Sequence, residues 1–268
     1  MIDITSPSNP LIKEIKSLYK KKGRWAKNLY LAEGIKIVEE CIDNDCPIVN
    51  IIYSDELLNT RGGQALFNRI KSYDRLVHVS DKLYREISDT ENPQGILAVI
   101  RFEVNSIENL KTRDNPFLLL LDEVQDPGNM GTIIRTADAF GIDGIIVTEG
   151  CVDIYNPKVV RSTMGSIFRT PIFHESDGVK IVEKLKDEGI KIYSTSLEGS
   201  QYIQNANFKE ACVLIIGNES KGVSEDLHFM ADELIKIPMM GGAESLNAAV
   251  ASSIIMYEAI RQRNQYFL

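Results

Sequence analysis

Short apolar runs alternate with amphipathic stretches along the second half of the chain. Five of these runs predict buried strands: FLLLL from residue 117, GIIVT from 144, KIYST from 191, CVLIIG from 212 and LIKIP from 234. Helical patterns follow residues 129, 157, 178, 224 and 245. Continuous apolar strands that alternate with helices predict a parallel α/β sheet covered on both faces. In such sheets, ligands bind beyond the carboxyl ends of the strands.

The first hundred residues carry a separate, smaller α/β pattern. Strands are predicted at 48–54, 75–80 and 95–102, and helices at 33–45, 62–73 and 82–87. A polar stretch at 103–116 ends in proline and separates the two patterns. We therefore expect an N-terminal domain at 1–105, a linker at 106–115 and a C-terminal domain at 116–268.

Composition excludes several classes of protein. No run approaches the ~18 apolar residues that cross a bilayer, and residues 1–16 lack the apolar segment of a signal peptide. We expect no membrane partner and a cytoplasmic location. The four cysteines form no CxxC pair and there are only three histidines, so no metal site is predicted.

The net charge of −8 is unevenly distributed. Residues 1–113 have 17 Lys and Arg against 16 Asp and Glu, whereas the remainder has 13 against 22. Within 13–27, seven basic residues accompany one acidic residue, with Tyr19 and Trp25 interleaved. This stretch is either a patch that binds a polyanion or a solvated helix face, and the charge pattern alone leaves both open.

Three motifs follow predicted strands in the second half. The first, QDPGNMGTIIRTADAFG at 125–141, has good helix caps in Asp126 and Gly141. The spacing of Gly128 and Gly131 matches neither of the two common phosphate-binding loops. Arg135, however, offers a planar charged fork that suits phosphate. The alternative is a plain strand-to-helix connection with a solvent-facing arginine.

The other two motifs also combine a strand end with polar residues. LIIGNESKGVSEDL at 214–227 places Gly217 and Glu219 after a strand, and Ser224 before a helix. In IKIPMMGGAESLNAAV, which begins at 235, Ser245 precedes a long C-terminal helix as its predicted N-cap. Each motif alone is also explained by turns and capping.

Taken together and in this order, the three motifs resemble the signatures of the SpoU/TrmH family in the SPOUT superfamily. The N-terminal segments ITSPSNPLIKEIKSL, LAEGIKIVEE and NPQGILAV resemble the accessory substrate-binding domain of that family, which is similar to ribosomal RNA-binding proteins. The resemblance implies S-adenosylmethionine-dependent methylation of a ribose 2′-hydroxyl in RNA. It also implies a parallel-sheet SPOUT domain with a C-terminal trefoil knot, and a homodimer. Departures are small: Pro127 and Gly128 stand where the family often has asparagine, and Ala248 and Ala249 where valine is common.

The resemblance implies roles for particular residues. The cofactor would be held by loops with the residues Thr195, Ser196, Leu197, Gly217, Asn218, Ile237, Pro238 and Leu246. The catalytic set would be Asn129, Arg135, Glu219, Ser245 and Asn247.

Arg135 has the central role in this hypothesis. The three motifs contain no histidine, and a guanidinium with a pKa above ~12 is a poor base. We expect Arg135 to bind the phosphate beside the target ribose and stabilise the developing alkoxide, while the phosphate or a water accepts the proton. The expected RNA surface comprises Lys13, Lys20, Lys21, Lys22, Arg24, Lys158, Arg161 and Arg169.

Alternatives remain at this stage. Ribosomal RNA is favoured as the substrate by the accessory domain, with transfer RNA as the alternative. A non-catalytic ribosome-assembly factor with a retained knot would keep the fold without the reaction. An unknotted dinucleotide enzyme would need a GxGxxG after residue 121, which the chain lacks.

Overall fold

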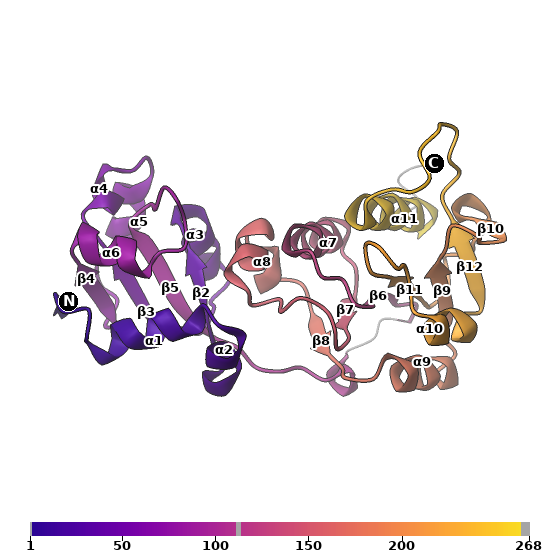
Figure 1. The fold of residues 1–268 in the computed structure, drawn as a ribbon, viewed down its shortest axis with the longest axis horizontal. Helices are drawn as coiled ribbons and strands as arrows, with labels where there is room; N and C mark the ends of the chain where they lie inside the picture. The colour runs from indigo at the N-terminus through magenta and orange to yellow at the C-terminus, as the bar shows by residue number, and fades with distance from the viewer. Residues whose placement is uncertain (1, 111–113, 264–268) are drawn as a thin grey trace. The chain divides into compact units, whose positions relative to one another are not determined.

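The chain folds into two compact units, each described here by itself (Figure 1). The computed structural model describes residues 2–110 and 114–263. The first unit comprises Met1–Glu103 and Asp153–Arg169, and the second Val104–Val152 and Thr170–Leu268. Residues 111–113, within the predicted linker, lie outside the described residues.

The first unit is built on a mixed five-stranded sheet in the order β1-β4-β3-β5-β2. β1, β4 and β3 run parallel, and β5 is antiparallel to both β3 and β2. Its elements are β1 (Ile2–Ile4), α1 (Pro10–Leu18), α2 (Lys21–Lys27), β2 (Leu29–Glu33), α3 (Ile35–Asp43), β3 (Ile48–Tyr53), α4 (Glu56–Asn59), α5 (Gly63–Ile70), β4 (Leu76–Val79), α6 (Asp81–Ile87), β5 (Ile96–Arg101), α8 (Pro157–Ser162) and the 3-10 turn η2 (Ser166–Phe168).

Helix periodicity explains the core of this unit. Ile12, Ile15 and Leu18 fall on one side of α1 and are fully buried. They pack with residues of α6 and of the sheet, such as Leu83 and Val77, in one apolar cluster. The opposite side of α1 carries exposed lysines, as an amphipathic surface helix requires.

A buried ion pair fixes residues 153–169 in the first unit. Arg24, only 2% exposed, donates from Nε and Nη2 to Oδ2 of Asp153 at 2.8 and 2.5 Å. Its Nη1 donates to the carbonyl of Leu18 at 2.8 Å. The ring of Tyr155 stacks on that of Phe102 at a centroid distance of 3.9 Å. Loss of one partner would leave the other charge buried, which typically costs about 3–5 kcal/mol of stability.

The second unit is a seven-stranded parallel sheet in the order β10-β12-β9-β11-β6-β7-β8. Its elements are η1 (Ile107–Asn109), β6 (Phe117–Leu121), α7 (Pro127–Phe140), β7 (Gly144–Val147), β8 (Ile172–His174), α9 (Gly178–Asp187), β9 (Lys191–Thr195), β10 (Gln201–Tyr202), η3 (Ile203–Asn205), β11 (Cys212–Ile216), α10 (Glu225–Met230), β12 (Glu233–Lys236) and α11 (Ala248–Arg263).

Helices cover both faces of this sheet (Figure 1). α7 and α11 pack together on one face, and α9 and α10 on the other. Successive side chains of a strand point to opposite faces, so Leu118 and Leu120 reach the cluster with Val182 and Leu185 of α9. Every residue of β6 and β11 is buried, which explains why these strands are apolar without alternation.

The five predicted strands and the helices between them are confirmed. The pattern missed β1, β2, β8 and β10. β8 and β10 have only three and two residues, too few for a periodic signal. β2 ends in Glu33, whose buried carboxylate accepts hydrogen bonds from the hydroxyl groups of Ser88 and Thr90, more than fifty residues along the chain. Among the described residues, no helix is long and apolar enough to cross a membrane.

Candidate active site at the carboxyl ends of the central strands

The carboxylate of Glu219 joins the second sequence motif to the first. Its Oε1 accepts hydrogen bonds from the backbone N–H of Asp126 at 3.0 Å and from Nδ2 of Asn129 at 2.9 Å. Its Oε2 accepts from the backbone N–H of Gln125 at 3.2 Å. Glu219 follows β11 and its donors follow β6, the neighbouring strand. The second motif is thereby bonded directly to the first.

Asn129 extends this connection to the third motif. Its Oδ1 accepts from Nδ2 of Asn247 at 2.8 Å. Oδ1 of Asn247 in turn accepts from the backbone N–H groups of Ala249 and Val250 at 2.9 and 3.2 Å. Asn247 is therefore the residue that caps α11, and the prediction of Ser245 as N-cap is wrong. The chain Glu219–Asn129–Asn247 links the turn after β11 to the starts of α7 and α11.

Hydrogen bonding governs the ionisation of Glu219. Burial by itself would raise the pKa of this carboxyl group. The hydrogen bonds from Asn129 and from the backbone N–H groups of Asp126 and Gln125 outweigh burial and hold the pKa below its usual value. Glu219 is therefore a carboxylate at neutral pH, and it acts as an acceptor that orients Asn129.

The turn after β11 explains Gly217. A Cβ on this residue would lie 2.1 Å from the carbonyl carbon of Gly222 and 2.2 Å from the nitrogen of Val223, both backbone atoms. Asn218 and Gly222 exchange backbone hydrogen bonds at 2.9 Å. The fold therefore needs a glycine at this position to close the turn.

The predicted cofactor loops leave three neighbouring strands. Thr195 ends β9 and Ser196 and Leu197 follow it. Gly217 and Asn218 follow β11, and Ile237 and Pro238 follow β12, in a sheet where the strand order is β12-β9-β11. The hydroxyl of Thr195 donates to the carbonyl of Ile215 at 3.1 Å, which joins two of these strand ends. Leu246 lies farther along the stretch between β12 and α11.

Arg135 lies on α7 and is exposed. Helix α7 begins with Asp126 as N-cap, whose side chain accepts from the N–H of Asn129 at 2.8 Å. It ends at Gly141, with φ of 64° in the left-handed region. Across the described parts of the chain, Arg135 has no ion-pair partner, so its guanidinium is available to an anion. Ser245, in the stretch before α11, is also exposed.

Asp122 is a polar residue near the site that the motifs did not indicate. It directly follows β6, is buried, and accepts at Oδ2 from the backbone N–H of Ser224 at 2.8 Å. Ser224 is the N-cap of α10 but makes no side-chain capping bond. The available signal was an acidic residue at the carboxyl end of an apolar strand, the position that parallel sheets use for sites.

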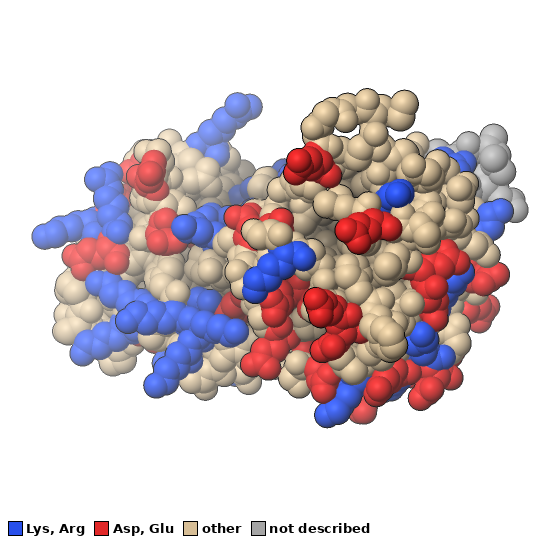
Figure 2. Space-filling view, turned by 45° about the vertical axis from the view of Figure 1, so that its right-hand side comes forward, with Lys and Arg blue, Asp and Glu red and all other residues tan. Residues whose placement is uncertain are grey.

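The eight predicted RNA-binding residues all lie in the first unit. Figure 2 shows Lys and Arg side chains gathered over this unit and more Asp and Glu over the second. Five of the eight are exposed lysines without an ion pair to any residue described: Lys13, Lys20, Lys21, Lys22 and Lys158. Arg24 is a correction, because its guanidinium is buried against Asp153 and cannot form part of a surface.

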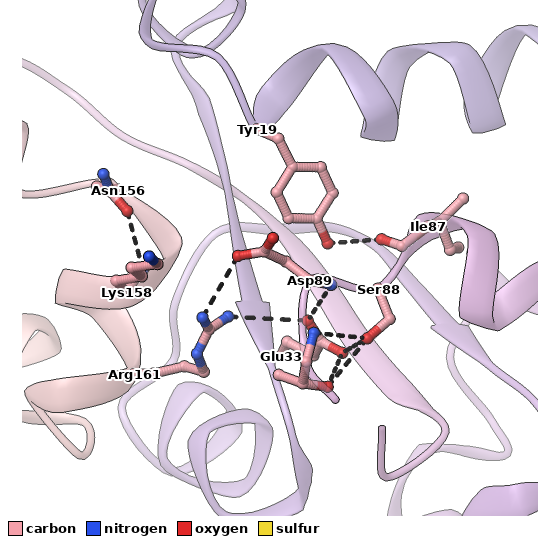
Figure 3. A network of polar contacts seen from close by, with 9 residues as sticks. Tyr19, Glu33, Ile87, Ser88, Asp89, Asn156, Lys158 and Arg161 are labelled. Carbon is pink, nitrogen blue, oxygen red and sulfur yellow. Dashed lines mark hydrogen bonds and ion pairs between the residues drawn. The ribbon is translucent and has the colours of Figure 1, made fainter. Parts of the chain in front are cut away.

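The remaining two arginines are engaged by carboxylates. Nη2 of Arg161 donates to Asp89 at 3.4 Å, and its Nη1 lies 4.0 Å from Glu33 (Figure 3). Glu33 also accepts hydrogen bonds from the hydroxyl groups of Ser88 and Thr90. Arg169 is paired with Glu40.

No group of three or more His, Cys, Asp or Glu side chains is placed to hold a metal ion within residues 2–110 and 114–263.

Comparison with known proteins agrees with this geometry. Residues 116–257 match the model of the SpoU rRNA Methylase family, and residues 9–98 match an MRM3-like substrate binding domain. The chain therefore belongs to the SpoU rRNA methylase family.

Individual relatives resemble the chain over nearly its whole length. It is 37% identical over 257 residues to the 23S rRNA (guanosine(2553)-2'-O)-methyltransferase RlmP of Bacillus subtilis, covering 96% of this chain and 98% of the relative. It is 30% identical over 239 residues to a 23S rRNA (uridine(2479)-2'-O)-methyltransferase of Streptomyces viridochromogenes, covering 87% and 83%. An AdoMet-bound rRNA methyltransferase from Sinorhizobium meliloti superposes with a TM-score of 0.86 at 31% identity, covering 98% of each chain.

The depressed pKa of Glu219 predicts a pH-dependent contribution to stability. Such a carboxylate stabilises the folded state above the unfolded pKa of about 4.3, and the contribution is lost as pH falls through the folded pKa. We expect Glu219→Gln to lower the urea midpoint at pH 7, with a difference from wild type that shrinks as the pH is lowered toward 3.

Glu225→Gln, an exposed glutamate in the first turn of α10, is the control for loss of a charge. A difference between wild type and Glu219→Gln that is constant from pH 7 to pH 3 would contradict the assignment.

Proposed function

We propose that this protein is an enzyme that transfers the methyl group of S-adenosylmethionine to a ribose 2′-hydroxyl in RNA, with ribosomal RNA as the substrate class. The observation that carries the proposal is the hydrogen-bonded chain Glu219–Asn129–Asn247. It joins all three family motifs beside an exposed arginine with no ion-pair partner among the described residues. The relatives named as ribosomal RNA 2′-O-methyltransferases over almost their full length support the same reaction.

The residues present fit S-adenosylmethionine. Neighbouring strand ends at 195–197, 217–218 and 237–238 share one edge of the sheet, and apolar side chains are present at Leu197, Ile237 and Leu246. Backbone donors and acceptors suit the adenine edge, and apolar side chains suit its faces. When bound, the sulfonium supplies an electrophilic methyl group.

The protein side chains then position the RNA and stabilise the charge that develops on the ribose oxygen. Arg135 binds the phosphate next to the target ribose, and its positive charge stabilises the oxygen as its proton leaves. Asn129, held by Glu219, and Asn247, bonded to Asn129, fix the starts of α7 and α11. Ser245 lies in the adjoining stretch, where its hydroxyl can orient the ribose. The proton passes to the phosphate or to water, since Arg135 stays protonated.

Two other functions are distinguishable from this one. Methylation of transfer RNA would use the same site with another substrate. A non-catalytic ribosome-assembly factor would have no need of an intact site, and the three joined motifs favour the enzyme over it. Mapping of 2′-O-methyl positions in ribosomal and transfer RNA, incubated with the protein and S-adenosylmethionine, decides among the three.

Arg135 provides the decisive variant. We expect Arg135→Ala to lower kcat/KM for RNA methylation by about 10²–10³-fold, the usual effect of removing one donor that stabilises a developing oxyanion. Arg135→Lys should restore part of the activity, because it keeps the charge but not the bidentate fork. Affinity for S-adenosylmethionine, measured by calorimetry, should not change.

The control is Arg261→Lys, a partly buried arginine that pairs with Glu258 near the C-terminal end of α11. Wild-type methylation by Arg135→Lys would exclude the proposed role for the guanidinium. Loss of cofactor affinity in Arg135→Ala would instead place Arg135 in the cofactor site.

We infer that the first unit binds the RNA through the exposed lysines at Lys13, Lys20, Lys21, Lys22 and Lys158. Arg161 and Arg169 would first have to release their carboxylates, so the test uses the lysines. Replacing Lys20, Lys21 and Lys22 with glutamine should weaken RNA binding. The slope of log K against log salt should fall by about 2, as expected for three lost phosphate contacts.

The matched control removes three charges from the second unit, at Lys180, Lys184 and Lys209. Cofactor affinity should stay the same in both triple variants. RNA binding that falls equally in the two would point to net charge instead of a defined surface.

We further infer a homodimer that buries the outer side of α11. Between Ala249 and Tyr257 this helix carries apolar residues on its outer as well as its inner side: Ala249, Ile255 and Met256 are buried, whereas Val250 and Ile254 are 47% and 36% exposed. A helix of this kind is normally covered on every side. Tyr257, 49% exposed, continues the stripe one turn on. A second copy of the same stripe would cover it in a two-fold arrangement.

The wild-type protein should sediment at twice the chain mass of 30.1 kDa. Val250→Glu with Ile254→Glu should sediment as a folded monomer, with its circular dichroism retained. Phe229→Glu, a fully exposed phenylalanine on α10, is the control and should stay dimeric. A monomeric wild type would exclude this interface.

The proposal also gives each domain a role. Residues 1–105 would serve substrate binding and 116–268 catalysis, joined by the linker 106–115, with residues 153–169 packed in the first unit. The C-terminal trefoil knot, a cytoplasmic location and catalysis without a metal ion are part of the same proposal.

A further inference from the structure

The C-terminal end of α3 brings two cysteines together. Asp45 adopts the left-handed region with φ of 50°. Its N–H donates to the carbonyl of Ile42 at 3.2 Å, and the N–H of Cys46 donates to the carbonyl of Cys41 at 3.0 Å. These two bonds define a Schellman motif, in which the side chains at the positions of Cys41 and Cys46 regularly contact each other.

The two thiols differ in environment. Cys41 is fully buried, whereas Cys46 is partly exposed. The Schellman geometry places the two side chains side by side, and the interaction between the two thiols is the largest influence on the pKa of each. It raises the pKa of Cys41, as does burial. It lowers the pKa of Cys46 in spite of partial burial and the charge of Asp45.

We propose that Cys41 and Cys46 form an oxidation site at which a hydroperoxide converts the thiol pair into an intramolecular disulfide. The thiolate of Cys46 attacks one peroxide oxygen, so that an S–O bond forms and the O–O bond breaks. The leaving oxygen takes a proton and departs as water or an alcohol.

The second step closes the disulfide. The sulfur of Cys41 attacks the sulfenic sulfur of Cys46, an S–S bond forms, and the hydroxyl leaves with the proton of Cys41 as water. Two thiols are thus oxidised by two electrons, and one peroxide is reduced. Cys46 suits the first step because it is partly exposed and its pKa is lowered. Cys41 suits the second step because it lies beside Cys46.

The other two cysteines lack these features. Cys151 donates from Sγ to the carbonyl of Leu121 at 3.3 Å, and burial raises the pKa of its thiol to about 11. Cys212 is buried and accepts at Sγ from Arg263 at 3.6 Å; burial raises its pKa to about 11. They are internal controls for unselective oxidation.

The experiment measures the thiol pair in the full-length protein. Trypsin cleaves after Lys36 and Arg61, so one peptide, 37–61, carries both Cys41 and Cys46 and no other cysteine. After treatment with one equivalent of hydrogen peroxide and alkylation in denaturant, this peptide should be two hydrogens lighter and unalkylated. Cys151 and Cys212 should be alkylated fully, and dithiothreitol should restore two labels to peptide 37–61.

Two variants separate the roles. Cys41→Ser should accumulate sulfenic acid at Cys46, captured by dimedone at least tenfold above wild type. Cys46→Ser, at the more exposed position, should leave Cys41 reduced. Circular dichroism confirms that each variant is folded, and if Cys41→Ser is not, Cys41→Val takes its place. Peptide 37–61 that remains doubly alkylated, or oxidation equal at all four cysteines, would overturn the proposal. These outcomes are independent of methyl transfer.

Discussion

The site depends on one carboxylate that accepts three hydrogen bonds from another part of the chain. Glu219 binds two backbone N–H groups of the stretch after β6 and the side chain of Asn129. Charge-assisted bonds of this kind are stronger than neutral ones. The turn after β11 and the start of α7 therefore hold one geometry.

Preorganisation is the functional consequence of this constraint. Asn129 presents one side-chain atom to Glu219 and another to Asn247, so the amide cannot rotate without losing both partners. The starts of α7 and α11 are thus fixed relative to β11. Arg135 extends from α7, two turns beyond this fixed start. A site with its supporting residues already bonded loses little entropy when a substrate aligns.

The first unit shows why a charge pattern along the sequence is not a surface. The basic stretch 13–27 contained Lys20, Lys21 and Lys22, which are exposed, and Arg24, which is buried against Asp153. All four are basic and close in sequence. The difference arises because Arg24 faces inward from α2 and meets a carboxylate 129 residues away. Glu33 is a comparable case, because its buried carboxylate accepts hydrogen bonds from the hydroxyl groups of Ser88 and Thr90.

The sequence by itself determined the parallel sheet, its five longer strands and the three strand-end motifs, because apolar periodicity and glycine turns are local properties. It also indicated Asn129, Arg135, Glu219 and Asn247 as one set through family resemblance. Only the tertiary structure decided that Asn247 caps α11, that Gly217 closes its own turn, and that residues 153–169 pack with the first unit. The cap depends on side-chain direction, the turn on the close approach of backbone atoms, and the packing of 153–169 on contacts between residues distant in sequence, none of which residue spacing encodes.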